Sequence, residues 1–297
     1  MGDRCHEQGA APMRAASIRS ELPEGSLALR EALYDGAIFR RAATDASRAL
    51  VADAQALLRE ALGELDDDLR RAPSRLADDA FFRRMGALRR RIYLGEDFYA
   101  HLRRLVVDLG FALDRVAFDP LRLRIVRGDG HLNPAAKAVY YAHRDTWYGH
   151  PQALLVGWLP LDDLRADETF VFYPDYFRRP AANDSETFDY DAWVRRGWSL
   201  KIGWQDPKAG LRARYPQMTG AIDAEAPALG FDARLGELLL FSGAHLHRTL
   251  PQVGARTRFS LDFRLVDLDD AGAGRGAPNC DNRSRGSAVP DYVRGRP

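Results

Sequence analysis

The chain has 297 residues, of which 46% are hydrophobic, and a formal net charge of +1. A chain of this length can bury a large core, and nothing in it requires more than one elaborated domain. Because 43 Lys and Arg residues nearly balance 42 Asp and Glu residues, the composition disfavours a nucleic-acid partner. The arginine clusters at 70–71 and 89–91 fall in helical patterns, where we expect a solvated face.

Cysteine usage and hydropathy narrow the class of protein further. Cys5 and Cys280 lie in terminal segments, which argues against a disulfide framework, a zinc site and a cysteine nucleophile. The first residues carry no apolar signal-peptide core, and no run approaches the roughly 18 apolar residues that a membrane span needs. We therefore expect a soluble, cytoplasmic protein with no membrane partner.

The N-terminal third of the chain predicts an arm followed by helices. Residues 1–25 mix Gly, Ala, Pro and charge without a period, which is typical of a disordered arm. Apolar residues then recur at helical spacing up to residue 62, behind Thr44 or Asp45 as the N-cap. Two more helices are expected at 78–93 and 96–109, on either side of Gly95. Together they form a helical layer at about 43–110.

From Leu121 the hydrophobic period changes from helical to two, which indicates strands. The expected strands cover residues 121–126, 137–147, 153–161, 169–174, 236–241 and 255–266. Turns rich in Gly, Pro and Asp join them, with no helix between, as in antiparallel β structure. Three helices followed by about eight strands predict a mainly β fold of the α+β class, a sandwich or jelly roll with a helical flank.

Two further segments complete the expected organisation. Residues from about 175 to 235 are aromatic and charged in short patches, too long for a hairpin loop, and predict a partly ordered insertion or lid. Residues 271–297 predict a loop-like tail, in which 290–293 can dock on the body. The main domain is then residues 26–270.

The expected strand at 137–147 contains a His-x-Asp pair. Strand side chains two apart point the same way, so His143 and Asp145 can enter one cavity while Arg144 points out. A distant histidine, His247, would complete a facial triad of two histidines and one carboxylate, which leaves three positions open on Fe(II). Alone, such a pair means little, since it arises often by chance.

The last expected strand separates into two faces. Its polar face consists of Arg256, Arg258, Ser260, Asp262 and Arg264. If this face looks into a cavity, Arg258 can form a bidentate pair with a carboxylate, and Ser260 can hydrogen-bond the same group. An exposed sheet edge would explain a polar face equally well.

At these motifs the chain resembles the Fe(II)/2-oxoglutarate-dependent oxygenases, specifically the phytanoyl-CoA-hydroxylase-like branch. The resemblance covers about residues 35–268 and rests on His143-x-Asp145, on His247 followed by Thr249, Pro251 and Gln252, and on Arg258 eleven residues after His247. Gln252 stands where relatives often have Asn, and the insertion is longer than expected.

The resemblance implies a cupin-like double-stranded β-helix in which His143, Asp145 and His247 hold Fe(II) and are the catalytic residues. It also implies that Arg258 with Ser260 binds the distal carboxylate of the cosubstrate 2-oxoglutarate. Such a dioxygenase consumes O2 and releases succinate and CO2, and its default outcome is hydroxylation of a small molecule. Desaturation, ring closure and epimerisation stay open. The Ala-, Arg- and Gly-rich composition resembles proteins of high-GC bacteria, where such enzymes often tailor natural products or amino acids.

Two residues near the motifs have competing interpretations. His245 would share a strand face with His247, but the Thr-Leu-Pro-Gln run after His247 fits the family spacing, so His245 is assigned to the surroundings of the pocket or to the core. Tyr141 shares the face of His143 and could hydrogen-bond the cosubstrate, or it is an ordinary packed tyrosine.

Five more residues are candidates for the substrate pocket. Trp147, directly after the triad carboxylate, is assigned to the pocket wall, together with Tyr148 and His150. Arg122 and Arg124 could line the cavity from a neighbouring strand, although exposed charges on an edge strand are the more common case.

Two rival classes of function compete with the oxygenase. A cupin-type enzyme would use the same triad without 2-oxoglutarate, and Arg258-x-Ser260 speaks against it. A non-catalytic β-sandwich binding module would need no metal, and the intact triad speaks against it. The sequence leaves the substrate and the oligomeric state open.

Overall fold

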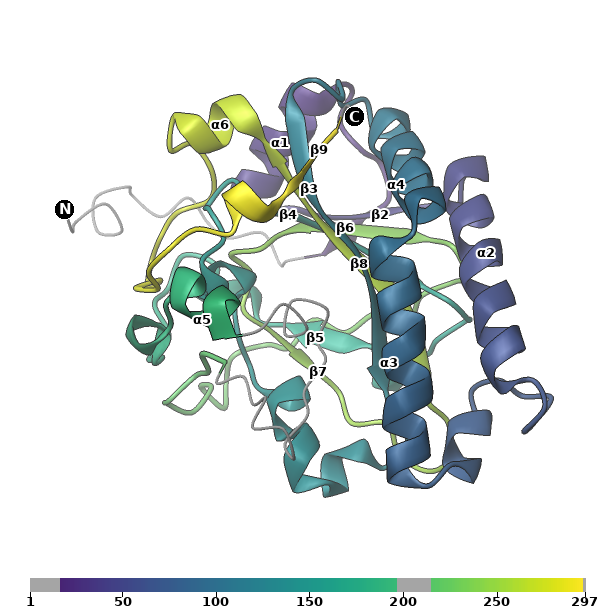
Figure 1. The fold of residues 1–297 in the computed structure, drawn as a ribbon. Coiled ribbons are helices and arrows are strands. Elements are labelled where there is room, and N and C mark those ends of the chain that lie inside the picture. The colour runs from purple at the N-terminus through teal and green to yellow at the C-terminus, as the bar shows by residue number, and fades with distance from the viewer. Residues whose placement is uncertain (1–16, 197–214, 296–297) are drawn as a thin grey trace.

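The computed structural model describes residues 17–196 and 215–295 (Figure 1). Within them the fold is mixed α/β, with a large and mostly antiparallel sheet. The helices are α1 (Ser26–Tyr34), α2 (Asp45–Leu62), α3 (Asp78–Leu94), α4 (Glu96–Asp108), α5 (Tyr190–Arg196) and α6 (Leu268–Gly272). None of these described helices has the length and apolar character that crossing a membrane would require.

Seven strands form the large sheet in the order β1-β2-β6-β4-β8-β3-β9, and two form a small sheet, β5-β7. Their bounds are β1 (Ile18–Arg19), β2 (Ile38–Arg41), β3 (Val116–Val126), β4 (Leu155–Pro160), β5 (Phe170–Phe172), β6 (Leu238–Ser242), β7 (His247–Thr249), β8 (Arg258–Asp267) and β9 (Val293–Arg294). Every pairing is antiparallel except that of β1 with β2. The longest pairing joins β3 with β8.

Helices α2, α3 and α4 cover one face of the large sheet (Figure 1). A capping box fixes the start of helix α2. The Thr44 hydroxyl accepts from the backbone N–H of Ser47, and the Ser47 hydroxyl accepts from the backbone N–H of Thr44. The apolar stripe of α2, which includes Leu50 and Leu58, is buried in the core between the helices and the sheet. The three predicted helices are therefore present within a residue or two of their predicted ends.

Alternation along β8 divides its side chains between two layers. Phe259, Leu261, Phe263 and Leu265 belong to the core under the helices. A Cβ at Gly157 on β4 would lie 2.2 Å from the Phe263 ring, so the glycine makes room for that ring. The polar residues of β8 face the other way, toward the small sheet. This strand's polar face is thus buried and is not a solvent-exposed edge.

The small sheet lies on the side of the large sheet opposite the helices (Figure 1). A second core joins aromatic residues of both sheets, including Trp158 of β4, Phe172 of β5 and Phe241 of β6. Short bridges add to this layer, among them Phe172 with Leu229. The described part of the expected insertion, residues 175–196 and 215–235, packs here, and residues 197–214 lie outside the described residues.

The strand predicted at 137–147 is wrong. Residues Pro134–Tyr140 and Asp145–Tyr148 form 3-10 turns, and between them only His143 makes a β-bridge, to His247. Val139, Tyr140 and Tyr141 favour strands by type, but in the described residues no neighbouring strand pairs with this segment except at His143. The motif therefore lies on a turn that touches the sheet at one residue.

The two ends of the described chain are also more regular than predicted. Ile18 and Arg19, inside the expected arm of residues 1–25, pair with β2, while residues 1–16 lie outside the described residues. In the expected tail, β9 pairs with Ala117 and Phe118 of β3, so the segment docks on the sheet.

Candidate active site

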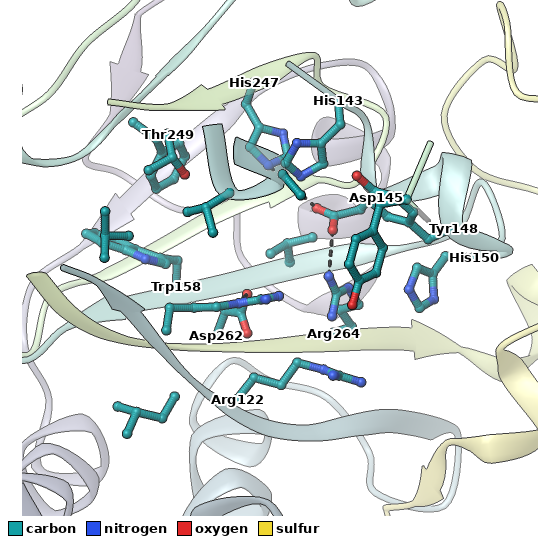
Figure 2. A pocket seen from close by; sticks show the side chains of 18 of the residues that line it. Arg122, His143, Asp145, Tyr148, His150, Trp158, His247, Thr249, Asp262 and Arg264 are labelled. Atoms are coloured by element: carbon teal, nitrogen blue, oxygen red, sulfur yellow. Dashed lines mark hydrogen bonds and ion pairs between the residues drawn. The ribbon is translucent and has the colours of Figure 1, made fainter. Parts of the chain in front are cut away.

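A cavity of about 280 Å³ lies between the polar face of the large sheet and the small sheet. Side chains of β3, β4, β6 and β8 line one side, and β5, β7 and the turn at 143–150 line the other. Figure 2 shows His143, Asp145 and His247 together at this cavity, with Arg264 of β8 below Asp145. The fold therefore gathers residues that are 100 positions apart in the sequence.

His143 and His247 lie side by side because their backbones are paired. The N–H of each donates to the carbonyl of the other, at 3.0 Å in both directions. The two imidazole ring centres are 4.4 Å apart (Figure 2). Both rings are thus held at the same place on the cavity wall by main-chain hydrogen bonds.

Each of these imidazoles has one nitrogen committed to the backbone. Nδ1 of His143 lies 2.8 Å from the Tyr141 carbonyl, and Nδ1 of His247 lies 3.0 Å from the His245 carbonyl. A carbonyl can only accept, so Nδ1 of each ring carries a proton, and Nε2 is the nitrogen that remains for a ligand. Burial lowers the pKa of His143 to about 3, which keeps this ring neutral at neutral pH. A neutral imidazole with a free Nε2 is the form that binds metals.

Asp145 is 4% exposed and ionised. Burial alone would raise the pKa of its carboxyl, but the Arg264 guanidinium and the two histidines outweigh burial and hold that pKa well below its usual range. Nη2 of Arg264 donates to Oδ1 at 2.7 Å, the dashed line in Figure 2. The other oxygen, Oδ2, lies 4.0 Å from Nε2 of His247.

The side chains of His143, Asp145 and His247 are of the types that bind a divalent metal. Their donor atoms lie farther apart than they would around a bound ion. In the described part of the chain, no group of three or more His, Cys, Asp or Glu side chains is close enough to hold an ion as it stands. Adjacent ligands at about 2.1 Å from a metal lie about 3 Å apart, so the 4.0 Å gap between Asp145 and His247 must close by about 1 Å. Because Arg264 holds Oδ1, Asp145 would bind through one oxygen.

The residues predicted to hold an anion, Arg258 and Ser260, have unsatisfied buried atoms. Arg258 lines the cavity, is 3% exposed, and donates from Nη1 to the Thr169 carbonyl at 2.7 Å. Within the described residues, its Nε and the hydroxyl of Ser260 have no hydrogen-bond partner. Burial lowers the pKa of Arg258 to about 10. A buried cation with free donors is stabilised when an anion binds it.

The predicted pocket residues Arg122 and Arg124 both line the cavity from β3. Arg122 pairs with Asp119 at 2.8 Å, and Arg124 donates from Nε to Asp262 at 2.7 Å. These pairs neutralise part of the charge of the cavity floor. An aromatic wall completes the cavity, formed by Tyr148, Phe188, Tyr190, Trp193 and Tyr215.

Comparisons with known proteins give only distant similarities. No family model and no curated protein matches the chain. Among solved structures it is similar to EvdO2 from Micromonospora carbonacea var. aurantiaca complexed with 2-oxoglutarate, with 15% identity, 59% of this chain and 61% of that chain covered, and a TM-score of 0.36. It is similar to SnoK, a non-heme alpha ketoglutarate dependent carbocyclase from nogalamycin biosynthesis, with 11% identity, coverage of 84% and 91%, and a TM-score of 0.38.

A third similar structure is AviO1 from Streptomyces viridochromogenes Tue57, with 12% identity, coverage of 84% and 97%, and a TM-score of 0.38. The matched region spans only about three fifths of the EvdO2 chain. With TM-scores below 0.5, these similarities carry no argument about activity. The function proposed below rests on the site itself.

Four of the predicted site residues do not line the cavity, namely Trp147, Tyr141, His245 and Ser260. Trp147 is fully buried, and its indole N–H donates to Asp281 at 2.8 Å. Tyr141 contributes its carbonyl to His143, but its ring is not part of the cavity wall. The Trp147 assignment assumed proximity to Asp145, and the Tyr141 assignment assumed strand alternation. Instead, Trp147 lies on the 3-10 turn at 145–148, and Tyr141 lies outside the strands.

His245 also lies outside the cavity wall. Its ring centre is 4.5 Å from that of Phe177 and 5.4 Å from that of Phe172, and among the described residues its only polar contact is a weak one with the Gly36 backbone. Burial lowers the pKa of His245 to about 3. Because β7 begins at His247, the two histidines do not share a strand face.

Several lining residues were not assigned from the sequence. Arg264 could have been found, since it lies on the same face of β8 as Arg258. Arg89 was assigned to a solvated face, yet it lines the cavity from α3. Trp193 and Tyr215 come from the expected insertion, where no periodic pattern indicates which side chains point inward.

Proposed function

We propose that this chain is a non-haem Fe(II) dioxygenase of the phytanoyl-CoA-hydroxylase-like branch, built on a double-stranded β-helix, that uses 2-oxoglutarate to hydroxylate a small molecule. The observation that carries the proposal is the pair of adjacent imidazoles, His143 and His247, each donating from Nδ1 to a backbone carbonyl, beside the ionised Asp145. Two histidines and one carboxylate on one side of a cavity are the ligands of an open iron site.

Under this proposal the three ligands have separate tasks. His143 and His247 supply neutral nitrogen ligands, and the carbonyls of Tyr141 and His245 hold their protons on Nδ1. Asp145 supplies the negative charge, and Arg264 holds its second oxygen in place. When bound, iron supplies the oxidation of the substrate by O2, coupled to the decarboxylation of 2-oxoglutarate.

Arg258 and Ser260 are proposed to bind the distal carboxylate of 2-oxoglutarate. The unpartnered Nε of Arg258 and Oγ of Ser260 support this assignment. Both atoms are buried, and burial makes a charge-assisted hydrogen bond stronger than it is in water. The aromatic wall excludes water from the substrate side. We also propose that the substrate is an amino acid or a natural-product intermediate.

The proposal is tested by titrating the anaerobic protein, loaded with Fe(II), with 2-oxoglutarate. A weak visible charge-transfer band should appear, because keto-acid chelation needs two adjacent open positions on the iron. Succinate, which lacks the keto group, is the control and should give no band. Air should then cause slow release of succinate from 2-oxoglutarate.

Stoichiometric iron with neither band nor succinate would contradict the use of 2-oxoglutarate and favour a cupin-type enzyme without a cosubstrate. Failure to bind iron at all would instead favour a non-catalytic binding module. The Asp145→Ala variant should lose native hydroxylation, since the carboxylate balances the iron charge.

A further inference from the structure

The charges that line the cavity do not balance. Five of the described lining residues are arginines, and two are aspartates. The arginines are Arg89, Arg122, Arg124, Arg258 and Arg264. Three of them pair with Asp119, Asp145 or Asp262, and Arg258 is assigned to 2-oxoglutarate under the proposed function. Arg89 is left without a carboxylate partner among the described residues.

Arg89 reaches the cavity around the edge of the large sheet. It lies on α3, and β3 is an edge strand beyond Ala117 and Phe118, where its pairing with β9 ends. Nε of Arg89 donates to the Leu123 carbonyl on β3 at 3.4 Å, a long contact, and its two Nη groups have no partner in the described part of the chain. Burial lowers the pKa of Arg89 to about 10, with the nearby charge of Arg124 as the second cause.

Arg124 presents a second guanidinium at the same end of the cavity. Only its Nε binds Asp262, so both of its Nη groups are unpaired among the described residues. Two neighbouring cations at a partly desolvated site repel each other, and an oxyanion between them would remove that cost. Planar guanidinium groups suit carboxylate or phosphate oxygens.

Aromatic rings adjoin this cationic end. The ring of Tyr215 lies 5.9 Å from that of Tyr148 and 6.4 Å from that of Trp193. Burial raises the pKa of the Tyr215 hydroxyl, and the charges of Arg122, Arg124 and Arg89 oppose that shift, which places the hydroxyl in their field. An acid with a flat, apolar body would find both kinds of partner here.

We infer that Arg89 and Arg124 form a second anion-binding subsite, which takes the oxyanion of a small acidic substrate whose ring-bearing body lies against Tyr148, Trp193 and Tyr215. The inference rests on the proposed function, because it takes Arg258 as the site of 2-oxoglutarate. The competing explanation for Arg89 is structural, namely that it covers the open edge of β3.

Calorimetric titration of the metal-free full chain tests the subsite with three probes: 3-phenylpropionate, phenyl phosphate and the uncharged 3-phenylpropanol. Arg89→Met removes the charge and keeps the aliphatic stem. It should weaken binding of the preferred anion about tenfold or more, as loss of a charge-assisted hydrogen bond does. Binding of the alcohol should not change. The tighter of the two anions identifies the oxyanion as carboxylate or phosphate.

Three further variants make the test specific. Arg83→Met, an exposed position on the same helix outside the cavity, should bind all probes like the wild type. Arg89→Lys should recover part of the affinity. Arg258→Met locates the probe, because loss of the anion in this variant alone would place it at the 2-oxoglutarate site instead. Thermal unfolding should show that Arg89→Met is no less stable than the wild type.

The subsite is overturned if the wild type binds neither anion, if Arg89→Met binds them as well as the wild type, or if only Arg258→Met loses them. A stability loss in Arg89→Met with unchanged affinity would establish the edge-covering role instead. The 2-oxoglutarate charge-transfer band separates this inference from the proposed function. If anion binding depends on Arg89 while no band forms, the subsite stands and the oxygenase fails.

Discussion

Arg264 on β8 and Asp145 on the turn after His143 form a buried ion pair, with Nη2 and Oδ1 2.7 Å apart and both side chains less than a tenth exposed. Arg264 also lies 3.3 Å from Asp119, so it links the candidate metal ligand to the floor of the cavity. A buried pair of this kind contributes less by mutual attraction than it costs when one partner is removed.

Arg264→Met should therefore destabilise the metal-free protein by about 3 to 5 kcal/mol, because it leaves Asp145 buried without its main counter-charge. Denaturant unfolding measures the change. Arg256→Met is the control, since Arg256 pairs with Asp68 at 3.5 Å where both are substantially exposed, and it should cost less than about 1 kcal/mol. Equal losses in the two variants would contradict the role of the pair.

His143→Ala and His247→Ala should each lose tight Fe(II) binding, because the two remaining ligands cannot hold a labile divalent ion against water. His245→Ala should keep most of it, since His245 is outside the cavity wall. Iron content after anaerobic reconstitution measures all three. The opposite pattern would show that the distal ligand is His245.

Arg258→Ala should raise the 2-oxoglutarate concentration that gives half of the charge-transfer band by about tenfold or more, while iron stays bound. The variant removes a charge-assisted contact worth about 2 kcal/mol. Arg256→Ala, at a partly exposed position beside β8, should change that concentration little. A similar rise in both variants would argue against Arg258 as the anchor.

Stability should fall as the pH decreases from about 6.5, above the range where carboxylates titrate. Burial lowers the pKa values of His143, His150 and His245 to about 3 from an ordinary 6.5. Between these values the unfolded chain binds protons that the folded chain does not, so stability is present above pH 6.5 and is lost as the pH falls toward 3. Thermal unfolding of the metal-free protein at pH 7.5, 6.5 and 5.5 measures the slope, and a flat profile would contradict it.

His245→Leu should flatten that slope and leave the protein at least as stable at pH 7.5. The His245 ring lies against Phe172 and Phe177, and its one polar neighbour among the described residues, the Gly36 backbone, makes only a weak contact with it, so an apolar side chain loses little. The same thermal unfolding series measures both effects. A clear loss of stability at pH 7.5 would show that the polar contact of His245 is strong.

Asp281→Ala should destabilise the fold by about 3 to 5 kcal/mol, because Asp281 in the C-terminal segment accepts from Arg144 at 3.0 Å and from Trp147 at 2.8 Å, on either side of Asp145. Glu186→Ala breaks an exposed pair with Arg283 and is the control, with an expected loss under about 1 kcal/mol. Denaturant unfolding measures the free energy of unfolding of both variants. Equal losses would contradict the claim that the buried Asp281 contributes more than the exposed Glu186.

Local patterns in the sequence predicted the helical layer and the two faces of the last strand. Helices α2, α3 and α4 have the predicted bounds to within two residues because caps and apolar periodicity act within a few residues along the chain. The alternation of β8 likewise placed Arg258 and Arg264 on one face. The motif residues His143, Asp145 and His247 were identified by type and spacing, and the structure brings them to one cavity.

Tertiary contacts decided the rest. The segment at 137–147 is not a strand, and the sequence could not show that Asp145 pairs with Arg264, 119 positions away, or that Arg89 passes the edge of β3 into the cavity. The choice of His247 over His245 rested on the Thr-Leu-Pro-Gln run that follows His247, and the tertiary contact behind it, the bridge of His247 to His143, is visible only in the structure. Spacing along a chain specifies which face of an element a side chain occupies, whereas the partner across that face depends on how distant segments pack.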